Sequence, residues 1–199
     1  MFQILFRVRS SGNLAALVAA AVLAGTPLKL GEPAPEVELL DQAERSLAEF
    51  RGRRVVAVAE SWRPSGLKTV GAKLRQRGVE LVRARLPEGA GFCLLDEGGV
   101  VRAVEPPPET AEGIVAFFEE WELGKKSFEW GCASCHGKDG RDTSQYGVKS
   151  LAGVGNRMSR EQLRLTLNAT MIAPGRYSIR CFHYSERELK ALVTFVRGL

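Results

Sequence analysis

The segment 132–136 carries the side chains of this chain that are best placed to do chemistry. Two thiols three positions apart, followed directly by an imidazole, form the C-x-x-C-H pattern to which a haem of the c type is attached. The thiols can add to two vinyl groups of one porphyrin, and the imidazole then lies under the iron as its proximal ligand. The pattern therefore predicts one covalent haem held by Cys132 and Cys135, with His136 as an iron ligand.

Paired cysteines also occur in zinc sites and in thiol redox motifs, so both alternatives must be weighed. A zinc site would need a second pair of ligands, and the remaining candidates, Cys93, Cys181 and His183, lack C-x-x-C or H-x-x-x-H spacing. A thiol redox pair normally follows a β-strand, whereas the pattern of residues 110–129 predicts a helix before the motif. Both alternatives are less well supported than haem attachment.

The two cysteines outside the motif have no predicted role in chemistry. Cys93 lies in an apolar run at residues 92–95, which predicts a buried and inert thiol. A disulfide between Cys93 and Cys181 is the alternative that the sequence leaves open.

The composition is that of a globular protein with a mixed charged surface. Of its 199 residues, 45% are hydrophobic and 26% are charged, and the net charge is +5 at pH 7. Basic and acidic residues alternate, with no basic run interleaved with aromatic residues, so a nucleic-acid partner is not expected. A net positive charge can instead steer an acidic redox partner.

Residues 1–29 are predicted to be a signal peptide or an N-terminal membrane anchor. Arg7 and Arg9 precede an apolar core at residues 14–24 (LAALVAAAVLA), and small residues follow where a signal peptidase could cleave. The uncharged stretch 10–28 is also long enough to cross a bilayer. Since positive charge on its N-terminal side keeps that end in the cytoplasm, either alternative exports the rest of the chain. We therefore expect a periplasmic location, or one on the extracytoplasmic face of the membrane.

The next part of the chain, residues 30–122, alternates strand-like and helix-like segments. A turn signal, DEGG, separates two apolar runs and predicts a hairpin. The predicted order is strand, helix, three strands and helix, at residues 55–60, 64–76, 79–83, 92–95, 100–104 and 110–121. This order requires a mixed sheet with helices packed on it.

Residues 31–35 (GEPAP), 50–54 (FRGRR) and 92–100, together with these elements, resemble the thioredoxin-like family, especially its peroxiredoxin and thiol-disulfide oxidoreductase branches. The resemblance implies an α/β/α domain over residues 30–122. The family's W-C-x-x-C motif falls on Trp62, and Arg63 and Gly66 occupy the two cysteine positions. Because a thiolate is the nucleophile in that chemistry, we expect an inactive scaffold or docking module.

Residues 123–199 resemble a class I c-type cytochrome domain. Gly124 and Phe128 match the family's first helix, the C-x-x-C-H motif follows, and residues 151–153 (LAG) match its loop under the haem. In the family the first and last helices cross, which implies that Gly124 and Phe128 meet Phe195. The resemblance implies a small all-α domain whose core is completed by one covalent haem c. The whole chain is thus expected to be α/β followed by all-α.

Two further helices are expected in this domain. They are amphipathic, span residues 159–167 and 185–196, and each begins with a capping box, Ser159 with Gln162 and Ser185 with Glu188.

The resemblance also points to a departure next to the iron ligand. The family usually has a proline before its Leu-x-Gly loop, and the carbonyl of that proline accepts the Nδ1–H of the proximal imidazole. Residues 148–150 (VKS) stand there in this chain. If His136 is oriented as in the family, a different carbonyl must accept its Nδ1–H.

Three residues after the predicted signal peptide or anchor are candidates for the sixth iron ligand: Met158, Met171 and His183. The family's axial methionine lies in the loop before the last helix, and Met171, with Pro174 after it, is expected to lie in that loop. His183 is the alternative, and an open sixth position is the third possibility. Met158 lies at the start of a predicted helix, where the family normally has a surface or packing residue.

These observations favour a non-enzymatic carrier of single electrons. Its partners would be redox proteins or a membrane respiratory complex, with the thioredoxin-like part as scaffold or docking module. Two alternatives from other classes stay open: a subunit of a thiol, sulfur or peroxide oxidoreductase, and a haem-based ligand sensor with a vacant sixth position.

Overall fold

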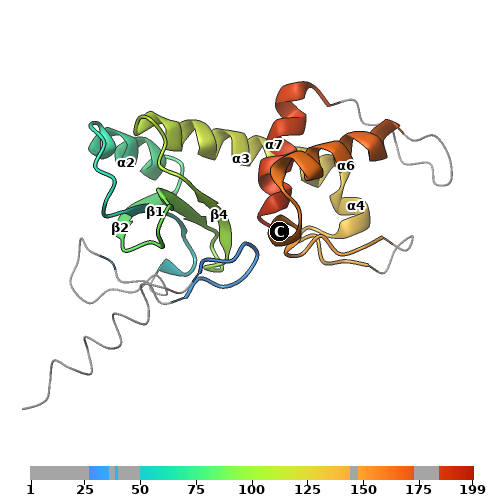
Figure 1. Ribbon diagram of the computed structural model, residues 1–199, viewed down its shortest axis with the longest axis horizontal. Helices are drawn as coiled ribbons and strands as arrows, with labels where there is room; N and C mark the ends of the chain where they lie inside the picture. Colours follow the sequence, from blue (N-terminus) through green and yellow to red (C-terminus); the bar gives the residue numbers. More distant parts are fainter. Residues whose placement is uncertain (1–26, 36–38, 40–49, 144–147, 173–183) are drawn as a thin grey trace, which may run out of the picture.

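The computed structural model describes residues 27–35, 39, 50–143, 148–172 and 184–199 (Figure 1). The predicted signal peptide or anchor lies almost wholly outside these residues and stays a prediction. In the described part of the chain, no helix has the length and apolar character needed to span a membrane. The helices and strands are β1 (Arg54–Ala59), α2 (Leu67–Arg75), β2 (Val79–Ala84), β3 (Phe92–Leu95), β4 (Val101–Glu105), α3 (Glu112–Gly131), α4 (Ala133–His136), α5 (Val154–Arg157), α6 (Arg160–Ile172) and α7 (Glu186–Arg197).

The first half of the described chain forms a four-stranded mixed sheet in the order β2-β1-β3-β4. Strand β1 pairs in parallel with β2 across helix α2, and antiparallel with β3, which in turn pairs antiparallel with β4. The predicted order of strands and helices and the mixed sheet are confirmed. The DEGG hairpin is confirmed as well, with Asp96 Oδ1 accepting hydrogen bonds from the backbone N–H groups of Gly98 and Val100, both at 2.9 Å.

Each face of the sheet is covered by a different layer because side chains alternate along the strands. On one face, Val56 and Val58 pack in a cluster with residues of α2 and α3. On the other, Val55, Ala57 and Cys93 pack against the N-terminal segments that contain Leu30, Leu39 and Phe50. Cys93 is fully buried and free, as predicted, and burial raises its pKa to about 12.

Helix α3 joins the two parts of the molecule and agrees with the helix expected over residues 110–129. The domain boundary expected at residues 122 and 123 falls in the middle of this 20-residue helix. Figure 1 shows α3 running from the sheet into the group formed by α4, α6 and α7. Gly124 lies inside this helix and is needed there.

The need for Gly124 comes from a close crossing of α3 with α7. Gly124 is buried, and a Cβ added there would overlap the carbonyl oxygen of Ala191 and lie 2.8 Å from the Cβ of Phe195. Phe128, one turn further on, packs against Phe195 with ring centroids 5.3 Å apart. The predicted meeting of Gly124 and Phe128 with Phe195 is therefore confirmed.

One hydrophobic core runs through both parts of the chain. Trp121 lies between them, with its ring 6.2 Å from that of Phe118 on the sheet side and 5.4 Å from that of Phe195 on the α7 side. A single cluster of buried side chains includes Val58 of the sheet together with Phe128 of α3 and others from α5, α6 and α7. The boundary predicted at residues 122 and 123 thus crosses a shared core.

Polar contacts reinforce the same junction. Glu105 of β4 accepts from Arg160 of α6 at 2.8 Å and from Arg197 of α7 at 3.4 Å. Arg102 donates to the carbonyl oxygen of Gly198 at 2.7 Å. Asn156 holds both backbone groups of Leu30, accepting from its N–H at 3.3 Å and donating to its carbonyl at 2.8 Å.

The shared core predicts that a defect in the sheet lowers the stability of the haem-binding part. Val58→Ala removes two buried methyl groups and should cost about 2 kcal/mol. We expect denaturation followed at the haem absorbance and by far-UV circular dichroism to shift together to lower denaturant. A haem transition that keeps its wild-type midpoint while the other signal shifts would contradict one cooperative unit.

The α3–α7 crossing predicts a second effect. Gly124→Ala should force the two backbones apart and destabilise the protein by about 2 kcal/mol or more. Gly71→Ala in α2 is the matched control, because its added Cβ would meet only the Leu81 side chain at 3.4 Å and alanine favours helix. Equal denaturation midpoints for the two variants would contradict a crossing that requires glycine.

Candidate haem-attachment site

The C-x-x-C-H motif forms one tight turn directly after α3. The Cys132 carbonyl oxygen accepts from the backbone N–H of Cys135 at 3.1 Å and of His136 at 3.0 Å. Residues at positions i, i+3 and i+4 of a helical turn share a face, so the two thiols and the imidazole are gathered on one side. Gly137 ends the turn at φ 72°, a conformation that L side chains rarely adopt. Both motif thiols are free.

The thiol of Cys132 lies in an enclosed environment. Burial raises the pKa of its thiol to about 11, and a hydrogen bond with Tyr184 opposes that rise only in part. The Tyr184 hydroxyl also donates to the carbonyl oxygen of Ser127 at 3.1 Å. A cysteine of this kind is protonated near neutral pH, and dithiol exchange depends on the thiolate. The environment therefore disfavours the interpretation of the motif as a thiol redox pair.

His136 is held in the form that binds a metal. Burial lowers the pKa of its imidazole, and the Lys149 backbone opposes that shift. The neutral ring has a lone pair for the iron, which the imidazolium lacks.

The second ring nitrogen of His136 needs an acceptor. Nδ1 is buried and has no partner in good hydrogen-bond geometry, although the Lys149 backbone acts on the ring. The Lys149 backbone lies close to the ring but is not aligned with Nδ1. Lys149 belongs to the segment 148–150 that stands in place of the family's proline, so its carbonyl is the candidate acceptor for Nδ1–H.

The zinc interpretation finds no support in the described residues. Among them, no group of three or more His, Cys, Asp or Glu side chains is close enough to hold a metal ion. A structural zinc site would need four such ligands.

Comparison with known proteins agrees with the geometry of the motif. Residues 121–199 match the family model described as Cytochrome c. The match supports a c-type cytochrome domain at this end of the chain. Such a domain carries covalently bound haem c, so haem c is its cofactor.

Other comparisons add little to this result. A search of curated proteins finds no match. Among solved structures, the OxyS anhydrotetracycline hydroxylase from Streptomyces rimosus is similar at 23% identity and a TM-score of 0.34. The alignment spans 52% of this chain and 24% of that protein, and a similarity this low supports no conclusion about fold or function.

The residues of the cytochrome domain fit the haem. Two free thiols and a neutral imidazole are the groups that covalent attachment and axial ligation require. Partly buried apolar side chains pack against the core from the motif, from the residues on either side of α5, from α6 and from the segment before α7. They are Cys132, Ala133, Leu151, Met158, Leu167 and Tyr184.

The candidates for the sixth ligand are placed only in part. Met171 was expected in a loop, but α6 extends to Ile172 and includes it in its last turn, while its side chain lies outside what the structure describes. His183 lies outside the described residues altogether. Met158 is partly buried against the core, in agreement with its predicted packing role.

Tyr184 is the contact at this site that the sequence analysis did not identify. The sequence offered one local indication of its role. Tyr184 directly precedes Ser185, the N-cap of α7, and an apolar residue at that position often packs against the first turn of the helix. Its contacts with Ser127 and Cys132 join positions more than 50 residues apart, and no sequence pattern indicates such a pairing.

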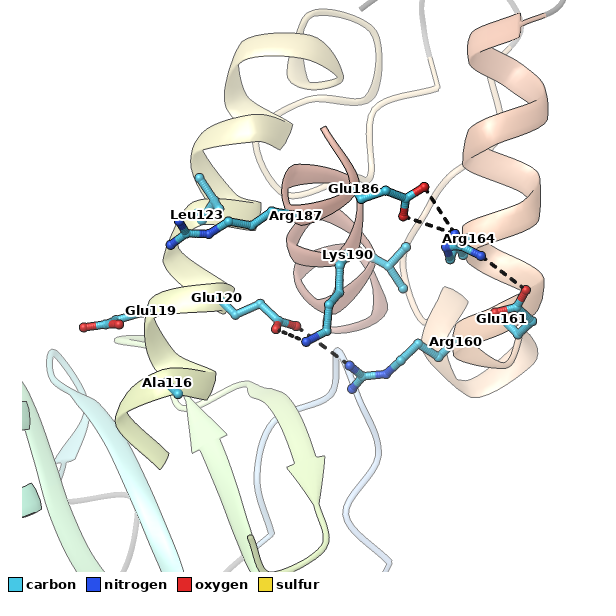
Figure 2. Close-up of a pocket in the computed structure, with 11 residues that line it drawn as sticks. Ala116, Glu119, Glu120, Leu123, Arg160, Glu161, Arg164, Glu186, Arg187 and Lys190 are labelled. Atoms are coloured by element: carbon cyan, nitrogen blue, oxygen red, sulfur yellow. Dashed lines mark hydrogen bonds and ion pairs between the residues drawn. The ribbon is translucent and has the colours of Figure 1, made fainter. Parts of the chain in front are cut away.

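A separate groove lies between α3, α6 and α7, away from the C-x-x-C-H motif (Figure 2). It is open, with a volume of about 690 Å³, and acidic and basic side chains line it together. Lys190 Nζ lies 2.7 Å from Glu120, and Arg164 lies 3.1 Å from Glu186. Burial would raise the pKa of Glu120, but hydrogen bonds from Lys190 and Thr194 outweigh it and lower the pKa. The groove is therefore a set of satisfied ion pairs rather than a second cofactor site.

The attachment geometry predicts the effect of removing the Cys132 thiol. Cys132→Ala should leave one thioether, through Cys135, and one intact vinyl group that extends the conjugation of the porphyrin. The reduced pyridine haemochrome of this variant should therefore absorb at longer wavelength than that of the wild type.

Cys93→Ala is the control, since that thiol is fully buried in the sheet. Its haemochrome should match that of the wild type. A wild-type haemochrome for Cys132→Ala would mean that Cys132 forms no thioether.

Proposed function

We propose that the protein is an exported carrier of single electrons with one haem c, held by Cys132, Cys135 and His136. The observation that carries the proposal is the C-x-x-C-H turn, with the half-buried His136 whose pKa burial lowers, within the segment that matches cytochrome c. Haem c supplies an iron that changes between two oxidation states by one electron. The leader with Arg7 and Arg9 supports export, because covalent haem attachment takes place outside the cytoplasmic membrane in the bacterial systems that this chain resembles.

The chain's own residues would keep the iron centre unchanged during electron transfer. The α4 turn fixes His136 relative to both attachment points, and the Lys149 backbone lies beside its ring. The apolar side chains around the motif exclude water, and an apolar surrounding disfavours the additional charge of oxidised iron. The site is thereby suited to a high redox potential and to little rearrangement.

We propose Met171 as the sixth ligand and His183 as the alternative. The resemblance to class I cytochromes and the place of Met171 at the end of α6, before the last helix, support this assignment. A thioether ligand raises the redox potential relative to a second imidazole.

We propose that the sheet of residues 30–122 is a thioredoxin-like scaffold without dithiol activity. The strand–helix–strand–strand–strand–helix order, the mixed sheet and the exposed Arg63 and Gly66 in the cysteine positions support it. The core that it shares with the cytochrome domain supports a scaffold that holds the haem rather than an independent module. Partners would be redox proteins or a membrane respiratory complex.

Methionine ligation predicts a spectroscopic signature. Oxidised wild-type protein should show a weak near-infrared band from sulfur-to-iron charge transfer, and Met171→Ala should lose it and lower the redox potential. Met158→Ala is the matched control and should keep both.

An unchanged spectrum for Met171→Ala would move the sixth position to His183 or leave it open. Carbon monoxide then separates the two: rapid binding to reduced wild-type protein would favour a ligand sensor over an electron carrier.

A further inference from the structure

The side chain of Tyr184 joins the start of α7 to the attachment turn at the end of α3. Its hydroxyl donates to the carbonyl oxygen of Ser127 at 3.1 Å and hydrogen-bonds with the Cys132 thiol. Its ring packs edge-on against Trp130, with the centroids 6.4 Å apart and the planes at 83°. Tyr184 and Cys132 both pack against the hydrophobic core. The phenol oxygen is therefore held beside the Cys132 sulfur by contacts on both its ring and its hydroxyl.

The single O–H of Tyr184 limits how the hydroxyl contacts the sulfur. A phenol has one hydrogen to donate and an oxygen that also accepts. Because the O–H is given to Ser127, the oxygen can accept the S–H of Cys132. When negative charge develops on the sulfur, the O–H can turn from Ser127 to the sulfur, which agrees with the way this contact lowers the pKa of the thiol. The same hydroxyl can thus hold the thiol before it reacts and stabilise it as its proton leaves.

The second attachment thiol has different surroundings. The Oγ atom of Ser134 lies 3.9 Å from the Sγ atom of Cys135, and Ser134 is exposed. A hydroxyl at that distance on an exposed residue holds a thiol weakly. The hydroxyl that is fixed by the core therefore belongs to Cys132, and the two thiols of the motif are held unequally.

We propose that Tyr184 is a positioning residue for haem attachment, which orients the Cys132 thiol for its addition to a vinyl group. The proposal goes beyond electron transfer and rests only on attachment of haem c at the motif. In the addition, the Cys132 sulfur forms a bond to the vinyl carbon next to the porphyrin ring. The S–H bond breaks and its hydrogen is placed on the terminal vinyl carbon, so the double bond becomes single and no oxidant or reductant is consumed.

The test follows attachment at each cysteine separately. The full chain is expressed with haem-maturation machinery, sampled at intervals after induction, denatured and alkylated, and the motif peptide is mapped by mass spectrometry. Tyr184→Phe keeps the ring that packs against Trp130 and removes the hydroxyl. Thioether formation at Cys132 should become about fivefold slower, as expected for loss of one hydrogen bond, while Cys135 keeps its wild-type rate. The early product should share the pyridine haemochrome of Cys132→Ala.

Two control variants separate the hydroxyl from its surroundings. Ser134→Ala removes the hydroxyl beside the other thiol and should leave the rate at Cys132 unchanged. Trp130→Phe changes the ring contact but keeps the Tyr184 hydroxyl, and it too should leave that rate unchanged.

The outcomes distinguish this role from a structural one. A wild-type rate at Cys132 in Tyr184→Phe would overturn the proposal. Equal slowing at Cys132 and Cys135 would overturn it as well, because it would show that the hydroxyl serves folding rather than one thiol. A wild-type chain without a thioether at either cysteine would overturn haem attachment itself, and with it the function proposed above.

Discussion

The contact between Gly124 of α3 and the backbone of Ala191 in α7 is the constraint on which the rest of the structure depends. Only a residue without a side chain lets the two helices approach so closely. The approach brings Phe128 and Trp121 against Phe195, so aromatic packing extends from the helices near the haem motif to the sheet. Because α3 continues unbroken to Gly131, the same helix that packs on the sheet also presents Cys132. The position of the attachment turn is therefore fixed by the core of the whole molecule.

Burial at the end of α3 determines the chemistry of the motif. It keeps the Cys132 thiol protonated and the His136 imidazole neutral, which disfavours thiol exchange and favours metal ligation. A small helical domain has little core of its own. Here the sheet supplies apolar partners through α3, and Glu105 adds contacts to Arg160 and Arg197. The sheet thus adds packing and ion pairs to the helical part that carries the motif.

Features with a local cause could be predicted from the sequence. The capping boxes at Ser159 and Ser185, the DEGG hairpin and the buried strands follow from short-range patterns, and the structure confirms them. The C-x-x-C-H motif was predictable because its spacing is imposed by the porphyrin. The crossing of Gly124 with Phe195 was predictable only through the resemblance to class I cytochromes.

Features that depend on distant contacts could not be predicted. The core that α3 shares with the sheet and with α7 crosses the boundary expected at residues 122 and 123, because packing against α7 outweighs the low helix propensity of Gly124. The helix expected to end at residue 167 continues to Ile172, since residues 168–172 contain no glycine or proline to stop it. The pairing of Glu105 with Arg160, and of Tyr184 with Ser127, joins residues 55 and 57 positions apart, and no pattern along the chain specifies these partners.

The most direct test of the central claim is the intact mass of the full chain, expressed with haem-maturation machinery and measured under denaturing conditions, followed by peptide mapping. Covalent attachment predicts a mass increase of one haem, located on the peptide that contains Cys132, Cys135 and His136. An unmodified mass, with both thiols free or joined in a disulfide, would contradict the account and return the cysteine pair to thiol chemistry.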